Sequence, residues 1–516
     1  MAELELFLSW FLLILLPAIT LTFFFFFNTS KSSSSSKLPK SYPLIGSSFT
    51  FLANFHRHNQ WATEVISIYP TNTHVLHLFG GFRIVITANP ENVKHILKDN
   101  FSNYPKGVAL GNILRDFLGN GIFNTDGANW KFQRQISSHE FNTKSLRKFI
   151  ADVVKTEIFD RLVPVLSMTG EKSSEIDLQD ILQRFAFDNI CKISFGYDPS
   201  YLSLALEKST EFAIAFEDAT RISSERISHM IHLVWKIKRF LNIGSEKRLG
   251  QAIATIRESA RTIIRQKKQE LNEEATDLLS RFVKDDNLEE DFVIDIVISF
   301  ILAGQDTTSA ALTWFFWLVS CHPQVEKEIL KEINQTAHEA GYDDVKDMVY
   351  IHAALCESMR LYPPVPIDSK EAASDDVLPD GTVVKKGMRV SYSPYAMGRM
   401  ENLWGTDCNE FRPERWLERD NADKFSFVAK DSYVYPVFQA GPRICLGKEM
   451  AFLQMKMVAV EVLRRFQVVP VANDFEPIFV SYLTSKMKGG FPVKIAKRTT
   501  HNSVVSGDFR LAICQH

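Results

Sequence analysis

The chain is poor in cysteine, and its few cysteines are not paired by spacing. Only six occur in 516 residues, scattered between positions 191 and 514. This scatter argues against a disulfide framework and favours free thiols in a reducing compartment. The six are Cys191, Cys321, Cys356, Cys408, Cys445 and Cys514.

The chain also lacks an excess of charge of either sign. Its 59 Lys and Arg residues nearly balance its 61 Asp and Glu residues, and the formal net charge is −2. Proteins that bind nucleic acid carry a basic footprint, so we expect no nucleic-acid partner. No internal repeat is present, and no linker rich in Pro, Gly or Ser follows residue 46. We therefore expect one large domain rather than several small ones.

Charge is missing altogether from a long apolar run near the N-terminus. Residues 6–27 hold no charged side chain, and as a helix they would extend about 33 Å, enough to cross a hydrocarbon core of ~30 Å. Acidic residues precede the run and Lys31, Lys37 and Lys40 follow it, so the positive-inside rule places the following chain in the cytosol. The acidic start and the length of the run favour a retained anchor over a cleaved signal peptide.

The sequence thus predicts three parts. A single-pass transmembrane anchor occupies residues 1–30. A Ser-rich tether with a proline hinge at Pro39 and Pro43 occupies residues 31–46, and one large folded domain occupies residues 47–516.

The large domain shows mainly helical patterns. Strand patterns are few: residues 73–87 predict two strands, and residues 377–392 predict a hairpin that turns at Asp380-Gly381. The expected fold class is therefore mainly α with a small β region. The helical segments include residues 144–166, 252–270 and 324–337.

A second apolar stretch, residues 291–319, contains polar groups at its centre. Because charge is most costly at mid-membrane, Asp306 favours a long helix inside the protein core over a membrane span. Gly304 lacks a side chain, so a small ligand could lie close to the backbone there. Thr307 and Asp306 could pass protons to such a ligand. The alternative is ordinary hydrogen bonding of Thr307 to the helix carbonyls.

The segment Phe438 to Gly447 presents one cysteine between glycines. No second cysteine or histidine lies near Cys445, so a zinc knuckle or a CxxC redox pair does not fit. A single thiolate suits a metal that brings its other ligands with it, as haem iron does. Glycines allow a tight turn and aim N–H groups at the sulfur. The alternative is a structural cysteine in a Gly-rich turn.

Two further pairs carry complementary chemistry. Trp130 and Arg134 lie four positions apart on one helix face and are donors only, which suits a carboxylate such as a haem propionate. Glu357 and Arg360 lie at i, i+3 on another helix, and Arg415 could add a second guanidinium. For this second pair the alternative is a surface ion pair.

Taken together and in this order, these segments resemble the cytochrome P450 superfamily over residues 37–496. The resemblance implies a cytochrome P450 fold, haem b as cofactor and Cys445 as the axial ligand of its iron. It implies that electrons come from NADPH through the flavins of a partner protein, NADPH–cytochrome P450 reductase. Residues 47–516 would then form the haem-thiolate monooxygenase domain.

The resemblance also implies roles for individual residues. Asp306 and Thr307 would deliver protons, while Glu357, Arg360 and Arg415 would form a structural ion network. Lys370 stands where the family usually has an arginine that binds a haem propionate. A lysine offers a point charge in place of the two parallel hydrogen bonds that a guanidinium can donate. The residues implied around the haem are Trp130, Arg134, Ala303, Gly304, Lys370, Phe438, Arg443, Cys445 and Gly447.

Within the superfamily, residues 189–198, 361–370 and 395–400 resemble plant fatty-acid omega-hydroxylases. This implies an enzyme of the endoplasmic-reticulum membrane, with a cytosolic catalytic domain, that hydroxylates a fatty acid at or near its terminal methyl. Jasmonoyl-isoleucine or the side chain of a sterol could be the substrate instead. The sequence also leaves open an oxygen-independent rearrangement of lipid hydroperoxides, and a haem-binding membrane protein without turnover.

Hydroxylation at a terminal methyl requires a pocket that admits the lipid chain end-on, because primary C–H bonds are harder to break than their neighbours. The expected walls of this pocket are Phe117, Ile122, Phe123, Ala303, Val365, Ile367, Tyr482 and Leu483.

Overall fold

The computed structural model describes residues 39–42, 45–141, 144–204, 211–228, 232–270, 277–284, 288–336, 341–419, 425–472 and 475–498. The chain divides into two compact units, Met1–Pro39 and Lys40–His516, and the described elements belong to the second. The predicted anchor over residues 1–30 and Pro43 of the predicted hinge lie outside the described residues.

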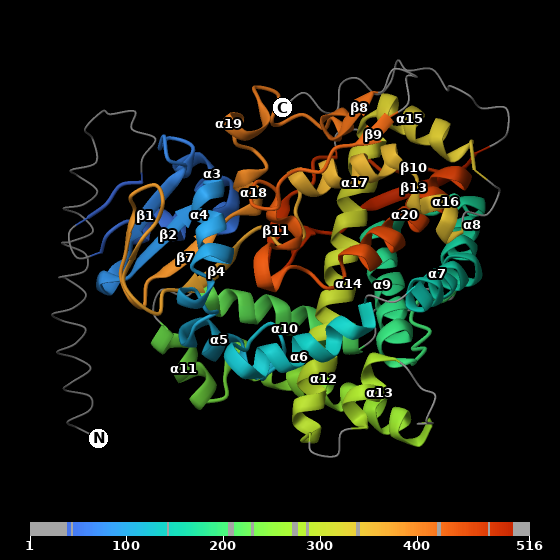
Figure 1. Ribbon diagram of the computed structural model, residues 1–516. Coiled ribbons are helices and arrows are strands. Elements are labelled where there is room, and N and C mark those ends of the chain that lie inside the picture. Colours follow the sequence, from blue (N-terminus) through green and yellow to red (C-terminus); the bar gives the residue numbers. More distant parts are fainter. Residues whose placement is uncertain are drawn as a thin grey trace. The chain divides into compact units, whose positions relative to one another are not determined.

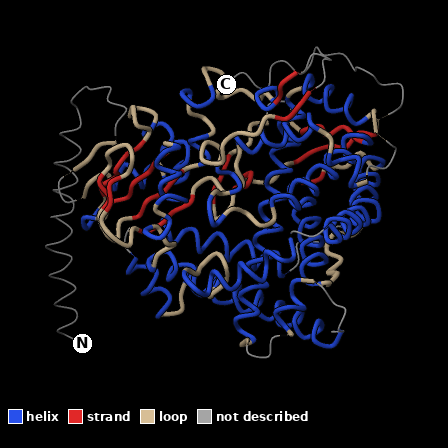
Figure 2. The backbone as a smooth tube through the Cα atoms, in the orientation of Figure 1, coloured by secondary structure: helices blue, strands red, loops and turns tan. Residues whose placement is uncertain are grey.

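Helices dominate the second unit, as predicted, and the strands form small groups among them (Figures 1 and 2). The predicted segment 144–166 is one long helical stretch, in which a π-helical turn at Ile158–Leu162 separates α7 from α8. The helices are α2 (Ser48–Ala53), α3 (His58–Ile66), α4 (Pro90–Lys94), α5 (Val108–Leu118), α6 (Gly127–Phe141), α7 (Lys144–Glu157), α8 (Val163–Glu171), α9 (Leu178–Phe195), α10 (Glu211–Ser228), α11 (His232–Phe240), α12 (Gly244–Glu270), α13 (Leu278–Val283), α14 (Glu290–Cys321), α15 (Pro323–Ile333), α16 (Tyr342–Lys346), α17 (Val349–Leu361), α18 (Pro394–Met397), α19 (Glu401–Trp404) and α20 (Lys448–Arg465).

The strands form one four-stranded sheet and several smaller ones. The larger sheet has the order β1-β2-β7-β4, with β2 and β7 parallel and the other pairs antiparallel. Both predicted strand regions are confirmed, although 377–392 yields a short hairpin followed by β7. The strands are β1 (Thr73–His77), β2 (Arg83–Thr87), β3 (Ile176–Asp177), β4 (Asp368–Glu371), β5 (Asp376–Val377), β6 (Val383–Val384), β7 (Arg389–Tyr392), β8 (Leu417–Arg419), β9 (Phe425–Phe427), β10 (Phe466–Pro470), β11 (Phe479–Ser481), β12 (Ser485–Met487) and β13 (Pro492–Lys497).

Helix α14 runs through the helical region and packs against α9, α12, α17 and α20 (Figure 1). It is long and apolar enough to cross a membrane, but 83% of its apolar window is buried inside the protein. Its hydroxyls bond back to the helix: Ser309 donates to the Gln305 carbonyl and Thr313 to the Ser309 carbonyl, both at 2.7 Å. Such bonds satisfy polar groups in an apolar interior, so the prediction of a core helix is confirmed.

The apolar core is built on both halves of α14. Trp314 and Phe315, in its C-terminal half, pack with residues of α17 and α20. Ile298 and Ile301, in its N-terminal half, pack with residues of α9, α10 and α12. A third cluster lies under the four-stranded sheet around Val85 and Val390. Helix α14 therefore contributes to the first two of these clusters and connects them.

Glu357 and Arg360 form a buried ion pair, so the surface-pair alternative is wrong. Both side chains are 0% exposed, and Arg360 donates two hydrogen bonds to the carboxylate at 2.7 and 2.8 Å. Arg415 Nε donates to Glu357 Oε1 at 3.1 Å, and Trp416 Nε1 donates to Oε2 at 2.9 Å. One carboxylate thus joins α17 to the segment Pro413–Trp416, and both of its oxygens are hydrogen-bonded.

Replacement Glu357→Gln should destabilise the fold strongly, because two buried guanidinium groups would lose their counter-charge. We expect the free energy of unfolding to fall by about 3–5 kcal/mol, measured by urea titration. Asp343→Asn is the matched control, since Asp343 pairs with Lys346 on the surface at 2.7 Å. Equal midpoint shifts in the two variants would contradict the structural role of Glu357.

Candidate functional site

The loop before α20 holds Cys445 through tight backbone contacts. The Cys445 N–H donates to the Phe438 carbonyl at 2.9 Å, and short helical turns at Pro436–Phe438 and Gly441–Arg443 shape the loop. Gly441 has φ +65°, and a Cβ there would collide with the Leu97 carbonyl oxygen. Only glycine fits both the conformation and the approach. Phe438 packs its ring on Phe452 of α20, with centroids 5.1 Å apart.

Among the cysteines of the described residues, Cys445 alone is exposed. It borders a cavity of about 660 Å³ that is also lined by Trp130, Arg134 and Lys448. Part of the Cys445 surface is accessible, but many protein atoms surround the sulfur. Their desolvation of the thiolate raises the pKa of the thiol. The Gly447 N–H, Arg134 and Lys448 act in the opposite direction, because each favours the thiolate.

Helix α6 places Trp130 and Arg134 beside the cysteine loop. Arg134 Nη2 donates to the Ile444 carbonyl at 2.7 Å. The guanidinium of Arg443 lies over the Trp130 ring, 4.4 Å from its centroid, and donates to Asp126 Oδ1 at 2.5 Å. Burial lowers the pKa of Arg443, and Asp126 opposes this effect. The structure therefore brings together the three residues predicted as propionate donors, and it adds Asp126, which the sequence patterns did not single out.

The donor set around Cys445 fits a haem. Arg443 Nε is buried and has no hydrogen-bond partner among the described residues, so it keeps a donor for a carboxylate. No group of three or more His, Cys, Asp or Glu residues in the described ranges could hold a metal ion, so Cys445 stands there without further metal ligands from those ranges. A metal that carries its own equatorial ligands needs no more.

Lys370 does not project freely toward the cysteine loop. Its side chain is fully buried, and Nζ donates to Asp368 Oδ2 at 2.7 Å. Burial lowers the pKa of Lys370 to about 7, and Asp368 opposes this effect. Asp368 also accepts from Lys106 at 3.0 Å, and from Gln439 in the cysteine loop. Lys370 is thus held in an ion pair with the carboxylate two residues before it, and its contact with a haem propionate stays a prediction.

Only two positions at the centre of α14 keep accessible surface. Ala303 and Thr307, at i and i+4, are half-buried, while the positions between them are buried. Thr307 Oγ1 donates to the Ala303 carbonyl at 2.5 Å, which is the back-bonding expected as the alternative. The expectation for Gly304 is wrong: a Cβ there would collide with Ile190 of α9, so the missing side chain admits a neighbouring helix.

Asp306 is held by a residue that the sequence patterns did not indicate. Its carboxyl is buried and accepts a hydrogen bond from Thr484 Oγ1 at 3.2 Å. Burial raises the pKa of Asp306, while Lys486 and the Thr484 bond oppose it. Thr484 lies at the end of the turn between β11 and β12, next to the expected pocket residues Tyr482 and Leu483. No local signal could have revealed this pairing across 178 positions.

The expected pocket walls divide into several environments. Phe117 is buried and packs edge-on against Phe216, with centroids 5.3 Å apart, and Leu483 packs against the same cluster. Ile122, Val365 and Tyr482 are half-buried, whereas Phe123 is exposed. Ile367 lines a separate cavity, described next.

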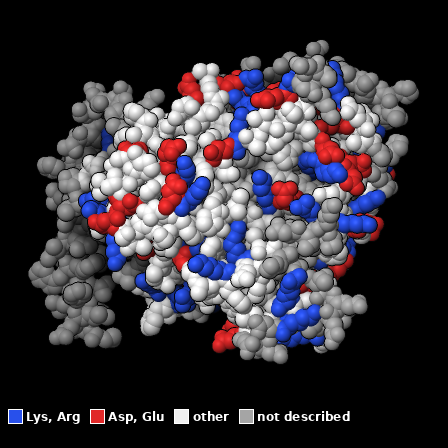
Figure 3. All heavy atoms as spheres, viewed as in Figure 1, with Lys and Arg blue, Asp and Glu red and all other residues white. Residues whose placement is uncertain are grey.

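A second cavity, of about 640 Å³, lies beside the four-stranded sheet, and we name it the sheet-side cavity. Its apolar walls include Phe51, Trp61, Leu76 and Phe82. Lysine and arginine side chains also line it, although on the face shown in Figure 3 charges of both signs are mixed. Helical or strand periodicity could not have predicted this cavity, because its walls come from several separate chain segments.

The chain matches the family model Cytochrome P450 over residues 37–490. It is 58% identical over 470 residues to Cytochrome P450 94A2 of Vicia sativa, a match that covers 90% of this chain and 91% of the relative. It is 58% identical over 467 residues to Cytochrome P450 94A1 of the same plant, with 89% and 91% covered. Cytochrome P450 94B1 of Arabidopsis thaliana is 50% identical over 474 residues, with 90% and 92% covered. The chain therefore belongs to the cytochrome P450 family of haem-thiolate monooxygenases.

Proposed function

We propose that this cytochrome P450 hydroxylates fatty acids at or near the terminal methyl. The observation that carries the chemistry is the accessible Cys445 thiol in a loop whose remaining donors suit a haem. The apolar residues that line the sheet-side cavity, among them Phe51, Trp61 and Leu76, support a lipid substrate. The resemblance of residues 189–198, 361–370 and 395–400 to plant fatty-acid hydroxylases supports the position of attack.

Cys445 would bind the haem iron through its sulfur, and Trp130, Arg134 and Arg443 would hold the haem carboxylates. When bound, haem supplies reductive activation of O₂ and insertion of one oxygen atom into a C–H bond. The chain's own task is to keep the sulfur ionised, which the Gly447 N–H and Arg134 favour. Lys370 acts indirectly, through Asp368, which bonds to Gln439 in the cysteine loop.

Thr307 and Asp306 are the proposed proton-delivery pair. Thr307 keeps accessible surface on α14. Asp306 lies next to it in the chain, and burial raises the pKa of the Asp306 carboxyl. Thr484 orients the Asp306 carboxyl through one hydrogen bond. A buried acid held in this way suits a reaction that consumes protons from solvent. It does not suit a rearrangement of hydroperoxides, which consumes none.

The proposed setting is the endoplasmic-reticulum membrane. Residues 1–30 would anchor the chain, residues 31–46 would act as tether, and residues 47–516 would form the cytosolic catalytic domain. NADPH–cytochrome P450 reductase would supply the electrons. The proposed topology leaves the catalytic domain open to protease in sealed microsomes, which a protection assay measures.

The proposed function is tested by incubating the full-length protein with reductase, NADPH and O₂. Lauric acid, oleic acid, jasmonoyl-isoleucine and a sterol are compared, and products are located by mass spectrometry. We expect terminal or near-terminal hydroxylation of a fatty acid. Exclusive turnover of jasmonoyl-isoleucine or the sterol would contradict the proposal, and product formation without NADPH would indicate hydroperoxide rearrangement.

Cys445→Ala should abolish both the carbon monoxide difference spectrum of a thiolate-ligated haem and all hydroxylation. The reason is that no other described cysteine is exposed. Cys321→Ala is the control, because Cys321 lies at the far end of α14 and should leave the spectrum intact. Turnover that persists in Cys445→Ala would disprove the assignment.

Thr484→Val should uncouple electron use from hydroxylation, because it removes the one hydroxyl that bonds to Asp306 while keeping the shape of the side chain. We expect several-fold more hydrogen peroxide per NADPH, an unchanged haem spectrum, and recovery in Thr484→Ser. Thr307→Ala should have the same effect. Thr313→Ala is the control on the same helix, and uncoupling of equal size there would indicate a purely structural effect.

A further inference from the structure

The sheet-side cavity lies on one face of the four-stranded sheet. The strand register places Leu76 opposite Ile84, and Ile84 opposite Arg389. Glu371 lies opposite Arg389 on the other side. Side chains alternate along strands, so these residues share one face, and all of them line the cavity. A single guanidinium is therefore placed on a face that is otherwise mainly apolar.

The second wall of the cavity is aromatic and aliphatic. Helix α3 packs against β1 and β2 and contributes Trp61, while Phe51 and Phe55 come from the chain just before it. Leu110 of α5 and Ile227 of α10 complete the lining on the side of the helical region. The cavity is thus an apolar space that suits a hydrocarbon chain.

Charge in the cavity is strongly one-sided. Glu371 is the single acidic residue among the lining residues, whereas six are Lys or Arg. The six are Arg83, Lys106, Lys370, Lys385, Lys386 and Arg389. This excess contrasts with the near balance of the whole chain, and it favours an anionic ligand.

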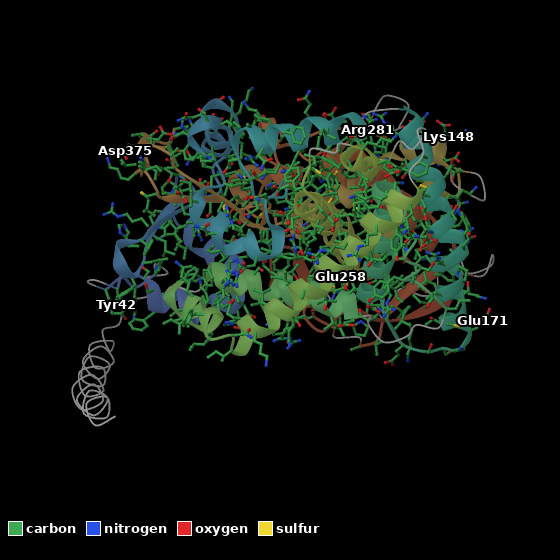
Figure 4. All side chains as sticks on the ribbon, turned by 90° about the horizontal axis from the view of Figure 1, so that it is seen from below. Tyr42, Lys148, Glu171, Glu258, Arg281 and Asp375 are labelled. Carbon is green, nitrogen blue, oxygen red and sulfur yellow. The ribbon has the colours of Figure 1, made fainter. Side chains whose placement is uncertain are left out.

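Three of these cations already have partners. Lys106 and Lys370 bond to Asp368, at 3.0 and 2.7 Å. Lys385 pairs with Asp375 at 2.8 Å, and Asp375 lies at the periphery of the protein (Figure 4). These lysines are therefore held by carboxylates of the protein itself.

Arg389, Arg83 and Lys386 make no side-chain hydrogen bond or ion pair within the part of the chain that the structure describes. Arg389 differs from the other two because it is half-buried, whereas they are exposed. Glu371, its neighbour across the strands, turns its carboxylate toward the start of α5, where Oε2 accepts from the Ala109 N–H at 3.3 Å. Burial lowers the pKa of Arg389, and Glu371 acts against this only at a distance. A guanidinium in an apolar wall without a bound partner is costly, and a carboxylate ligand would remove that cost through two parallel hydrogen bonds.

We propose that the sheet-side cavity binds the carboxylate end of a long-chain fatty acid, with Arg389 as its anchoring cation. This proposal rests on the proposed function. The proposed function concerns hydroxylation at the methyl end of the fatty acid, and the present proposal concerns binding of its ionised carboxylate. Lys106 and Lys370 of the cavity wall donate to Asp368, which also accepts from Gln439 of the cysteine loop. In the proposal, a substrate held at Arg389 by its head extends its hydrocarbon chain toward the haem side. A sterol, which has no carboxylate, would not use Arg389.

The test measures equilibrium binding to the full-length haem-loaded protein by calorimetry, with palmitic acid, methyl palmitate and hexadecanol as probes. Arg389→Met should weaken binding of palmitic acid by about tenfold to a hundredfold, the loss expected for a charged hydrogen-bonded pair. Binding of the ester and the alcohol should stay the same. Arg389→Lys should recover part of the affinity, because it keeps the charge and loses the fork.

Lys385→Met is the matched control, since Lys385 lines the same cavity but is paired with Asp375 on the surface. It should leave all three affinities unchanged, as should Arg83→Met at the exposed start of β2. Equal losses for acid and ester in Arg389→Met, or an acid-specific loss in Arg83→Met instead, would overturn the assignment. The carbon monoxide spectrum of each variant reports whether the fold is intact. If Arg389→Met does not fold, the affinities of the unmodified protein for palmitic acid and methyl palmitate provide the test. Equal affinities for the two would refute the proposal.

Failure of this inference is distinguishable from failure of the proposed function. If the unmodified protein hydroxylates fatty acids terminally while Arg389→Met binds them equally well, the head is recognised elsewhere and only the inference is wrong. If no fatty acid is bound or hydroxylated by the unmodified protein, the proposed function and the inference both fail.

Discussion

The structure depends on holding one sulfur atom at a fixed place on an otherwise unreactive surface. The backbone carries most of this constraint: Cys445 donates its N–H to Phe438, and Gly441 packs against the Leu97 carbonyl with no room for a side chain. Such contacts must place the sulfur, because no second metal ligand from the described residues defines its position. Arg134 and Arg443 can then serve to supply positive charge near the sulfur, because the backbone contacts already hold the loop in place.

Buried charge is handled in this protein by carboxylates that collect several donors. Glu357 accepts from Arg360, Arg415 and Trp416, and thereby connects segments almost sixty positions apart. Asp368 plays a similar part for Lys106 and Lys370. Removing one partner of a buried ion pair costs about 3–5 kcal/mol, because the remaining charge is left buried without a counter-charge. These clusters are therefore rigid supports beneath the site.

Arg389 and Asp306 have fewer hydrogen-bond partners than the charged groups of those clusters. Among the described residues, the Asp306 carboxyl has one hydrogen bond, from Thr484, and the Arg389 side chain has none. Ionisable groups left incompletely paired in a protein interior are expected where a substrate or a proton completes them. The two groups lie on different elements, α14 and β7, so the head of a lipid and the reacting end can be controlled separately.

The sequence by itself determined the local features, because each depends on neighbours along the chain. The isolated cysteine between glycines, the apolar helix interrupted at Asp306, the i, i+4 pair on α6 and the turn at Asp380-Gly381 all follow from spacing and side-chain type. Tertiary structure decided which partners these residues meet. It placed Ile190 against Gly304, Asp368 against Lys370 and Thr484 against Asp306. It also assembled the sheet-side cavity around Arg389. Contacts of this kind are set by packing between segments distant in the chain, for which short-range periodicity carries no information.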